Sequence, residues 1–232
     1  MSHNTTRQLN NKILSLLFFI LLAAGADAQN IVVTTAATRI DSNVVWHSPS
    51  DFRKIMGRRC SALASPNFQE CFISLMTDLG ASAEAVRFAA LTDTTGYVRH
   101  FVNTGIVDVA YVSYPFRANE NFGISLVNGI PDMIDVDDFQ FVDLTALKKD
   151  SVYLDIVGRF PDASVWPGDR FAFDQPVSQS LTGGGQRFIV SYNIRNGCHA
   201  CEQIGIARFA FDFDNYGKFE GTRLLDVVSL VR

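Results

Sequence analysis

The last part of the chain, from Gln186 to Val231, most strongly constrains the fold. It contains three runs in which apolar and polar residues alternate: Arg187 to Ile194, Ile204 to Phe213 and Phe219 to Val231. Alternation with a period of two is typical of β-strands that bury one face. Compact loops join the runs, so they predict a three-stranded antiparallel meander. A meander alone buries little apolar surface, so we expect the rest of the chain to pack against one of its faces.

The N-terminus has the features of a secretory signal peptide. Arg7 and Lys12 precede the apolar run Ile13 to Ala24, and the triplet Ala26-Asp27-Ala28 matches a cleavage site. The apolar run is shorter than the roughly 20 residues that a membrane-spanning helix needs. We therefore expect a cleaved signal peptide over residues 1–28 and a single α+β domain over residues 29–232, located in the periplasm or outside the cell.

The charge of the chain argues against two classes of partner. The formal net charge is −4, and removal of residues 1–28 makes it one unit more negative. No block of Lys or Arg is present, so neither nucleic acid nor an anionic membrane surface is an expected partner. No stretch after the signal peptide is long and apolar enough to span a bilayer, so we expect no stable membrane insertion after cleavage.

All four cysteines lie beyond the predicted cleavage site: Cys60, Cys71, Cys198 and Cys201. An even number of cysteines in an exported chain predicts two disulfides. Four cysteines allow three pairings, and the sequence does not fix which one forms. Local spacing favours Cys60 with Cys71 and Cys198 with Cys201, because each of these pairs closes a short loop.

The order of predicted elements indicates an α+β fold. Helices are predicted at Ser50–Arg58, from a Ser65-Pro66 cap to Gly80, and from Ser82 onward, with a further helical turn or two over Tyr97–Val102. A last helix is predicted to end at about Phe160, and Asp143, Thr145 or Ser151 is its cap. Strands are predicted at Ile106–Tyr114, Phe122–Val127, Met133–Val136 and Arg170–Phe173, with a turn at Asn128-Gly129. Asn30–Thr38 is expected to be a first strand or an extended lead-in. Helices and strands that segregate along the chain predict N-terminal helices packed on a mainly antiparallel sheet that ends in the C-terminal meander.

The loop Cys198-His199-Ala200-Cys201 is the strongest candidate for a functional site. In one interpretation its cysteines form a disulfide that stiffens a loop between two strands. In the other they are a redox pair, in which a thiolate of lowered pKa attacks substrate disulfides. The spacing resembles thioredoxin-type sites, but those motifs precede a helix near the start of their fold. Here the residues after Cys201 alternate as strands, so the stiffening disulfide is favoured.

The sequence predicts neither a metal nor a cofactor. Glu202 follows Cys201 at the position where a haem attachment motif has His. Beyond the signal peptide the histidines are His47, His100 and His199, and no second pair of closely spaced cysteines completes a zinc site. The segment from Asp212 to Glu220 resembles a calcium loop only in part, and a hairpin turn explains it better.

Two polar clusters are further candidates for a site. The acidic residues Asp132, Asp135, Asp137 and Asp138 follow Pro131, and strand alternation places Asp135 and Asp137 on one side. Such a pair suits acid–base chemistry or a cation, while solvated charge at a strand end is the alternative. The loop residues Arg117, Asn119, Glu120 and Asn121 lie between aromatic residues. They suit the lining of a binding cleft with Trp166, or a loop that caps the core.

A disulfide-braced loop that presents His199 resembles, in its chemistry, the Cys-and-His loop that bacterial periplasmic inhibitors of vertebrate-type lysozyme insert into their target. The resemblance covers this loop and the following strand, and the spacing of the residues differs. No G-x-S-x-G or H-E-x-x-H motif and no glycine-rich phosphate loop is present.

These observations favour an exported, non-enzymatic binding or inhibitor-like protein whose partner is another protein or a component of the cell envelope. The candidate contact residues are His199, Arg117, Asn119 and Trp166. A thiol–disulfide redox protein that uses Cys198 and Cys201 is the alternative.

Overall fold

The computed structural model describes residues 39–60, 67–92, 96–117, 121–168, 170 and 176–231. The predicted signal peptide and the strand or extended lead-in expected at Asn30–Thr38 lie outside these residues. The described helices are α1 (Phe52–Arg59), α2 (Phe68–Asp78), α3 (Ala83–Leu91), α4 (Leu144–Leu147) and α5 (Ser151–Arg159), with short 3-10 helices η1 (Ser42–Val44) and η2 (Phe139–Phe141). No helix among the described residues is long and apolar enough to cross a bilayer.

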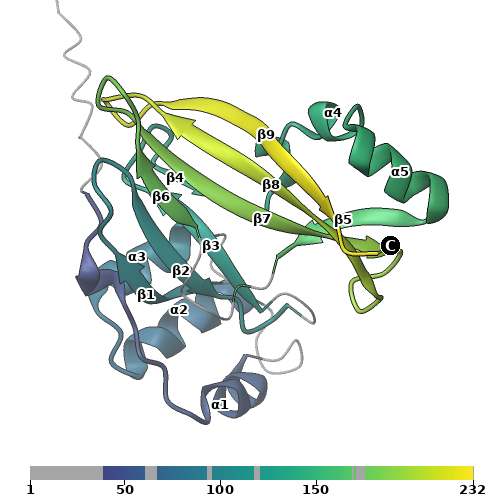
Figure 1. Ribbon diagram of the computed structural model, residues 1–232. Coiled ribbons are helices and arrows are strands. Elements are labelled where there is room, and N and C mark those ends of the chain that lie inside the picture. The colour runs from purple at the N-terminus through teal and green to yellow at the C-terminus, as the bar shows by residue number, and fades with distance from the viewer. Residues whose placement is uncertain are drawn as a thin grey trace, which may run out of the picture. The chain divides into compact units, whose positions relative to one another are not determined.

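The strands form two antiparallel sheets, and the α+β class is confirmed (Figure 1). The first sheet has the order β1-β2-β3-β4, formed by Tyr97–Val102, Asp108–Ser113, Phe122–Val127 and Met133–Asp135. The second has the order β5-β7-β8-β9, formed by Ala163–Pro167, Gln186–Asn196, Gln203–Phe213 and Phe219–Ser229, with β6 (Val177–Ser180) also paired to β7. The predicted C-terminal meander is therefore β7, β8 and β9.

Two short strands share one edge of β7. β6 pairs with the start of β7, from Gln186 to Ile189, and β5 pairs with its end, from Tyr192 to Asn196. The sequence did not predict either strand. The strand expected at Arg170–Phe173 falls almost wholly outside the described residues, and Arg170 itself is not in a strand.

The two sheets share one apolar core. Val109 and Leu126 of the first sheet lie in the same cluster as Phe188 and Phe209 of the meander, and α4 and α5 add Leu147 and Ile156. The opposite face of the first sheet packs on Phe88 of α3. All six residues of β2 are buried, as expected for a strand covered on both faces. The N-terminal helices therefore pack on the first sheet rather than on the meander.

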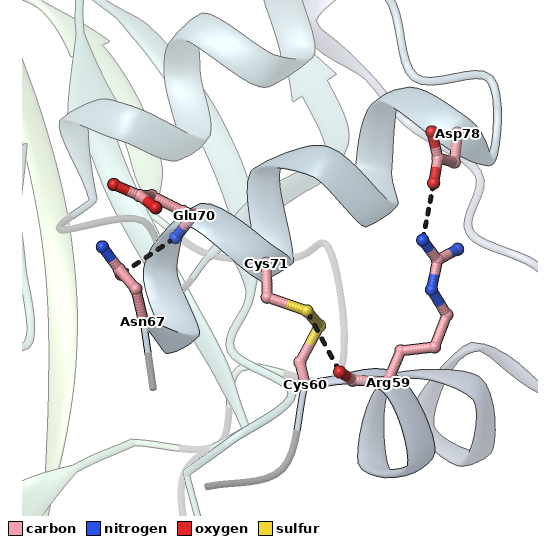
Figure 2. Close-up of a disulfide and its surroundings, with 6 residues drawn as sticks. All are labelled: Arg59, Cys60, Asn67, Glu70, Cys71 and Asp78. Carbon is pink, nitrogen blue, oxygen red and sulfur yellow. Dashed lines mark hydrogen bonds and ion pairs between the residues drawn. A yellow bond between two sulfur atoms is a disulfide. The ribbon is translucent and has the colours of Figure 1, made fainter. Parts of the chain in front are cut away.

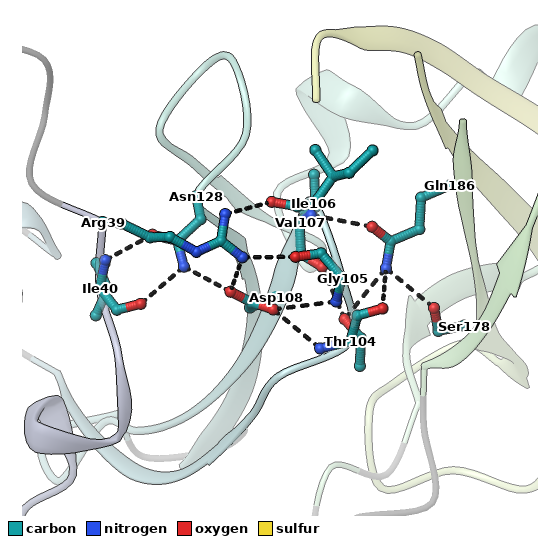
Figure 3. Close-up of polar contacts among 10 residues, drawn as sticks. All are labelled: Arg39, Ile40, Thr104, Gly105, Ile106, Val107, Asp108, Asn128, Ser178 and Gln186. Atoms are coloured by element: carbon teal, nitrogen blue, oxygen red, sulfur yellow. Dashed lines mark hydrogen bonds and ion pairs between the residues drawn. The ribbon is translucent and has the colours of Figure 1, made fainter. Parts of the chain in front are cut away.

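A polar contact also joins the two sheets. Gln186, the first residue of β7, accepts a hydrogen bond from the backbone N of Val107 at 2.9 Å (Figure 3). Its side-chain nitrogen donates to the carbonyl oxygen of Thr104 at 3.1 Å and to Ser178 of β6 at 3.1 Å. The buried amide thus has partners for both its donor and its acceptor, and it fixes the start of β7 beside the start of β2.

The fully buried carboxylate of Asp108 organises the start of β2. It accepts hydrogen bonds from Arg39 at 2.6 Å, from the side chain of Asn128 at 2.7 Å and from the backbone N of Thr104 at 2.9 Å (Figure 3). A buried charge needs such partners to offset the loss of its hydration. The network therefore fixes Arg39 and the β3–β4 turn at Asn128 against the first sheet.

The ends of α2 and α3 follow local sequence signals. Asn67 caps α2 by accepting a hydrogen bond from the backbone N of Glu70 (Figure 2). Ser82 caps α3 in the same way, by accepting from the backbone N of Ala85. Gly80 ends α2 with a positive φ of 83°, where glycine carries no steric penalty. The prediction of a cap at Ser65 was wrong, because the Asn67 side chain caps the helix; Ser65 and Pro66 lie outside the described residues.

The structure joins Cys60 to Cys71 and Cys198 to Cys201, the pairing that local spacing favours. The first disulfide ties the end of α1 to the first half of α2 (Figure 2). An ion pair of 2.7 Å between Arg59 and Asp78 joins the same two helices. The covalent bond lies beside the buried face of α2, because Cys60 is buried and Cys71 is half-buried.

One predicted helix was wrong, and another was confirmed at its cap Asp143 and at its end near Phe160 but is divided in two. Tyr97–Val102 forms strand β1 because it pairs with β2 from Val109 to Ser113, with a bulge between Val98 and His100. The helix expected to run to Phe160 is split into α4 and α5. Asp143 caps the first and Asp150 caps the second, so each helix has its own start signal.

Candidate functional site

The loop between β7 and β8 is closed by the disulfide between Cys198 and Cys201. Strand pairing continues to the base of the loop, where the backbone N of Asn196 donates to the carbonyl oxygen of Glu202 at 3.0 Å. Gly197 then adopts a φ of 92°, a conformation that side chains disfavour. Inside the bridge, the backbone N of Cys201 donates to the oxygen of Cys198 at 3.0 Å. The loop is thus a tight turn with a covalent clasp.

Strand β5 braces one side of this loop. The indole nitrogen of Trp166 donates to the carbonyl oxygen of Gly197 at 3.1 Å and to the hydroxyl of Ser164 at 2.9 Å. The Ser164 hydroxyl in turn donates to the same carbonyl oxygen. On the other side, Arg195 donates to the carbonyl oxygen of Cys201 at 2.9 Å. Hydrogen bonds from β5 and β7 therefore fix the backbone on both sides of the disulfide.

The His199 side chain lies against Trp166. The two rings meet edge to face with centroids 5.4 Å apart, a favourable aromatic arrangement. Cys198 and Ala200 are exposed, while His199 and Cys201 are half-buried. The loop therefore exposes Cys198 beside the half-buried pair formed by His199 and Trp166 of β5. The structure brings together two of the predicted contact residues, His199 and Trp166.

The surroundings of Cys198 differ from those of a thioredoxin-type site. The described residues around it belong to the end of β7, the turn and the start of β8, so Cys198 precedes a strand and no helix begins there. A helix N-terminus lowers a thiol pKa by placing partial positive charge beside the sulfur. This loop lacks that source of thiolate stabilisation.

Arg117 belongs to a different cluster, at the end of β2. Its guanidinium lies 3.6 Å from the centre of the Tyr114 ring, a cation–π contact, and 3.9 Å from the carboxylate of Asp135. Asn119, the other predicted contact residue, lies outside the described residues. Because Arg117 contacts Tyr114 and Asp135 while Trp166 contacts the β7–β8 loop, the structure gives the two predicted cleft residues separate partners.

Asp135 has an unusual electrostatic environment. Burial, followed by the nearby charge of Asp137, raises the pKa of Asp135 from 3.8 to about 6. Arg117 and a hydrogen bond from the backbone N of Asp137 oppose this shift. The Tyr114 hydroxyl lies 3.4 Å from the carboxylate, and burial raises the pKa of that phenol. Asp135 is therefore a carboxyl group that changes charge close to neutral pH.

Asp137 has a different partner from Asp135. Its Oδ1 accepts hydrogen bonds from Nε and Nη2 of Arg170, at 3.1 Å and 2.8 Å, and both side chains are almost fully buried. Arg170 also donates to the carbonyl oxygen of Ser191 in β7 at 3.1 Å. Sequence reasoning missed this ion pair, because Arg170 follows Trp166-Pro167-Gly168 in a region without periodicity. Asp137 is therefore ion-paired with Arg170, although its charge still contributes to the raised pKa of Asp135.

No group of three or more His, Cys, Asp or Glu residues in the described parts of the chain is arranged to hold a metal ion. No protein-family model, curated protein or solved structure matches the chain. The two disulfides are compatible with a protein of an oxidising compartment.

Proposed function

We propose that the protein is an exported, non-enzymatic binding protein that contacts a partner macromolecule through the β7–β8 loop. The partner is another protein or a component of the cell envelope. The observation that carries the proposal is the bracing of an exposed loop by a disulfide, by Trp166 and by Arg195. His199, packed on Trp166, is the central contact residue.

Pre-organisation is the physical reason for this proposal. A loop that becomes ordered only on binding loses conformational entropy, at about 0.5–1.5 kcal/mol for each side chain immobilised. In this loop the backbone already has its hydrogen bonds, and the disulfide limits the number of conformations. An aromatic residue with few rotatable bonds and an imidazole that donates and accepts hydrogen bonds are well suited to such an interface.

The test is a comparison of captured partners. The chain from residue 29 onward is immobilised and exposed to periplasmic or host extracts, and the bound material is identified and quantified. The same is done with His199→Ala and with Cys198→Ser/Cys201→Ser. The proposal expects at least one partner to bind the unmodified protein and to be lost from both variants.

His47→Ala is the matched control, because it removes the same side chain from an exposed position in the N-terminal part of the chain. It should retain every partner of the unmodified protein. If all captured partners remain on His199→Ala and on the double cysteine variant, the β7–β8 loop is not the binding element.

Thiol–disulfide exchange by Cys198 and Cys201 is the second candidate function. It is favoured by the exposure of Cys198 next to a half-buried Cys201, an arrangement that gives an attacking thiolate access to substrate and leaves the second cysteine to resolve the mixed disulfide. Thiol trapping in buffers of graded redox potential separates the two functions. A pair that stays oxidised at about −300 mV behaves as a structural disulfide.

A further inference from the structure

A second site lies away from the β7–β8 loop. A cavity of about 360 Å³ opens between α3, the segment at Arg39 and Ile40, and the turn that joins β3 to β4. Its volume falls within the range of pockets that bind small molecules. This cavity is independent of the proposed binding loop.

One face of α3 forms a wall of the cavity. Glu84, Arg87, Phe88 and Leu91 line it, and their spacing of three, four and seven residues places them on the same side of a helix. Phe88 is buried, whereas the Leu91 side chain is 52% exposed. The helix therefore contributes an apolar wall with charged groups at its edge.

The opposite wall is held in place before any ligand binds. Asn128 accepts a hydrogen bond from the backbone N of Ile40 at 2.7 Å and donates to its carbonyl oxygen at 2.8 Å. Arg39 donates to the carbonyl oxygens of Gly105 and Ile106 and to the carboxylate of Asp108 (Figure 3). Because Asp108 neutralises Arg39, the charge of this guanidinium is already compensated within the protein.

Three charged side chains at the cavity have no such compensation. Glu84, Arg87 and Asp132 line it and are exposed, and none of them forms an ion pair with another described residue. The rim thus offers two carboxylates and one guanidinium above apolar Ile40, Phe88 and Leu91. The two carboxylates would repel a purely anionic ligand, and a purely apolar ligand would leave all three charged groups without a partner.

We propose that this cavity binds a small zwitterion with an apolar side chain, that is, an apolar α-amino acid, free or as a dipeptide. Glu84 and Asp132 recognise its ammonium group, Arg87 recognises its carboxylate, and Phe88 with Leu91 contacts its side chain. Arg87 suits this role because a guanidinium binds a carboxylate through two parallel hydrogen bonds.

The test uses compounds that differ by one charge. L-Leucine, L-leucinamide and 4-methylpentanoate have nearly the same apolar body, but the second lacks the carboxylate and the third lacks the ammonium. Binding to the chain from residue 29 onward is measured by calorimetry at about pH 6.5, where α-amino groups are protonated. L-Leucine should bind about three- to fivefold more tightly than either analogue, as expected for partly exposed ion pairs. Leucyl-leucine, measured alongside, distinguishes a free amino acid from a dipeptide as the preferred form.

Variants assign each charge to its partner. Arg87→Gln should remove the preference for leucine over leucinamide, and Glu84→Gln/Asp132→Asn should remove the preference over 4-methylpentanoate. The matched controls Arg53→Gln and Glu220→Gln remove the same charges from exposed positions elsewhere and should leave both preferences unchanged.

Leu91→Trp, which fills the cavity at a half-exposed position, should abolish binding without lowering the unfolding temperature. Equal affinities for the three compounds, absence of binding at about 10 mM, or leucine binding that survives Leu91→Trp would overturn the proposal.

Discussion

Trp166 and His199 meet edge to face, with ring centroids 5.4 Å apart, across the boundary between β5 and the β7–β8 loop. The same indole donates a hydrogen bond to the carbonyl oxygen of Gly197. One side chain therefore positions both the imidazole and the backbone of the loop. The disulfide closes the loop, and Trp166 together with Ser164 ties it to β5 through the carbonyl oxygen of Gly197.

Replacement of Trp166 by Phe tests this role. The ring contact with His199 is retained, whereas the hydrogen bonds to Gly197 and Ser164 are lost. The free energy of unfolding should fall by about 1–2 kcal/mol, since a hydrogen bond contributes about 0.5–1.5 kcal/mol. Urea denaturation gives this value, and partner affinity should fall as well. Trp46→Phe, in the core beside α1, should lower stability but leave the affinity unchanged; an equal loss of affinity would contradict the role of Trp166.

The two disulfides should separate stability from binding. Cys60 and Cys71 are 11 residues apart in sequence, and Cys198 and Cys201 are three apart. Loop-closure entropy predicts a loss of about 3 kcal/mol without the first bridge and about 2 kcal/mol without the second. Removal of the Cys60–Cys71 bridge should thus lower the free energy of unfolding more but retain partner binding. Removal of the Cys198–Cys201 bridge should lower it less but abolish partner binding. Denaturation and capture assays on both double Cys→Ser variants check this, and loss of binding from only the Cys60/Cys71 variant would refute it.

Asp135 should make stability depend on pH. Its pKa is raised in the folded state from 3.8 to about 6, so the folded protein binds more protons than the unfolded chain between these values. The free energy of unfolding should therefore decrease as the pH rises from about 4 to 6, by up to about 3 kcal/mol from this group. Asp135→Asn should flatten that part of the curve and be the more stable protein at about pH 7.5. Urea denaturation at a series of pH values gives the free energy of unfolding of both proteins. If it depends on pH in the same way for both, the pKa of Asp135 is not raised in the folded state.

The buried pair of Arg170 and Asp137 should be strongly coupled. Their side chains are only 2% and 5% exposed. Removing one partner leaves an uncompensated buried charge, so Arg170→Met or Asp137→Leu alone should cost about 3–5 kcal/mol. The double variant should cost much less than the sum of the two. A double-mutant cycle measured by denaturation gives the coupling, and additive losses would mean that the two side chains do not interact.

The meander was predictable because its strands are each 11 residues long, are joined by compact loops and contain runs in which apolar and polar residues alternate. The segment Tyr97–Val102 was not. Its apolar residues Tyr97, Val98, Phe101 and Val102 have helical spacing because the bulge at Arg99 adds one residue and interrupts the alternation of β1. Strands β5 and β6 were missed because they are short and depend on pairing with β7.

The candidate site was predictable only in part. The cysteine spacing and the flanking alternation identify a closed loop between strands. The brace by Trp166 could not be predicted, because it depends on the register in which Ala163 of β5 pairs with Asn196 of β7. Likewise, strand alternation predicts that Asp135 and Asp137 lie on one side, but it does not predict the ion pair of Asp137 with Arg170, which is distant in sequence.

The dissociation constant of a captured partner, measured for the unmodified protein, His199→Ala and His47→Ala, tests the central claim most directly. If the β7–β8 loop is the contact element, the His199 variant should bind at least about tenfold more weakly, as expected for a central interface residue, and the His47 variant should match the unmodified protein. Equal dissociation constants for all three proteins would contradict the account.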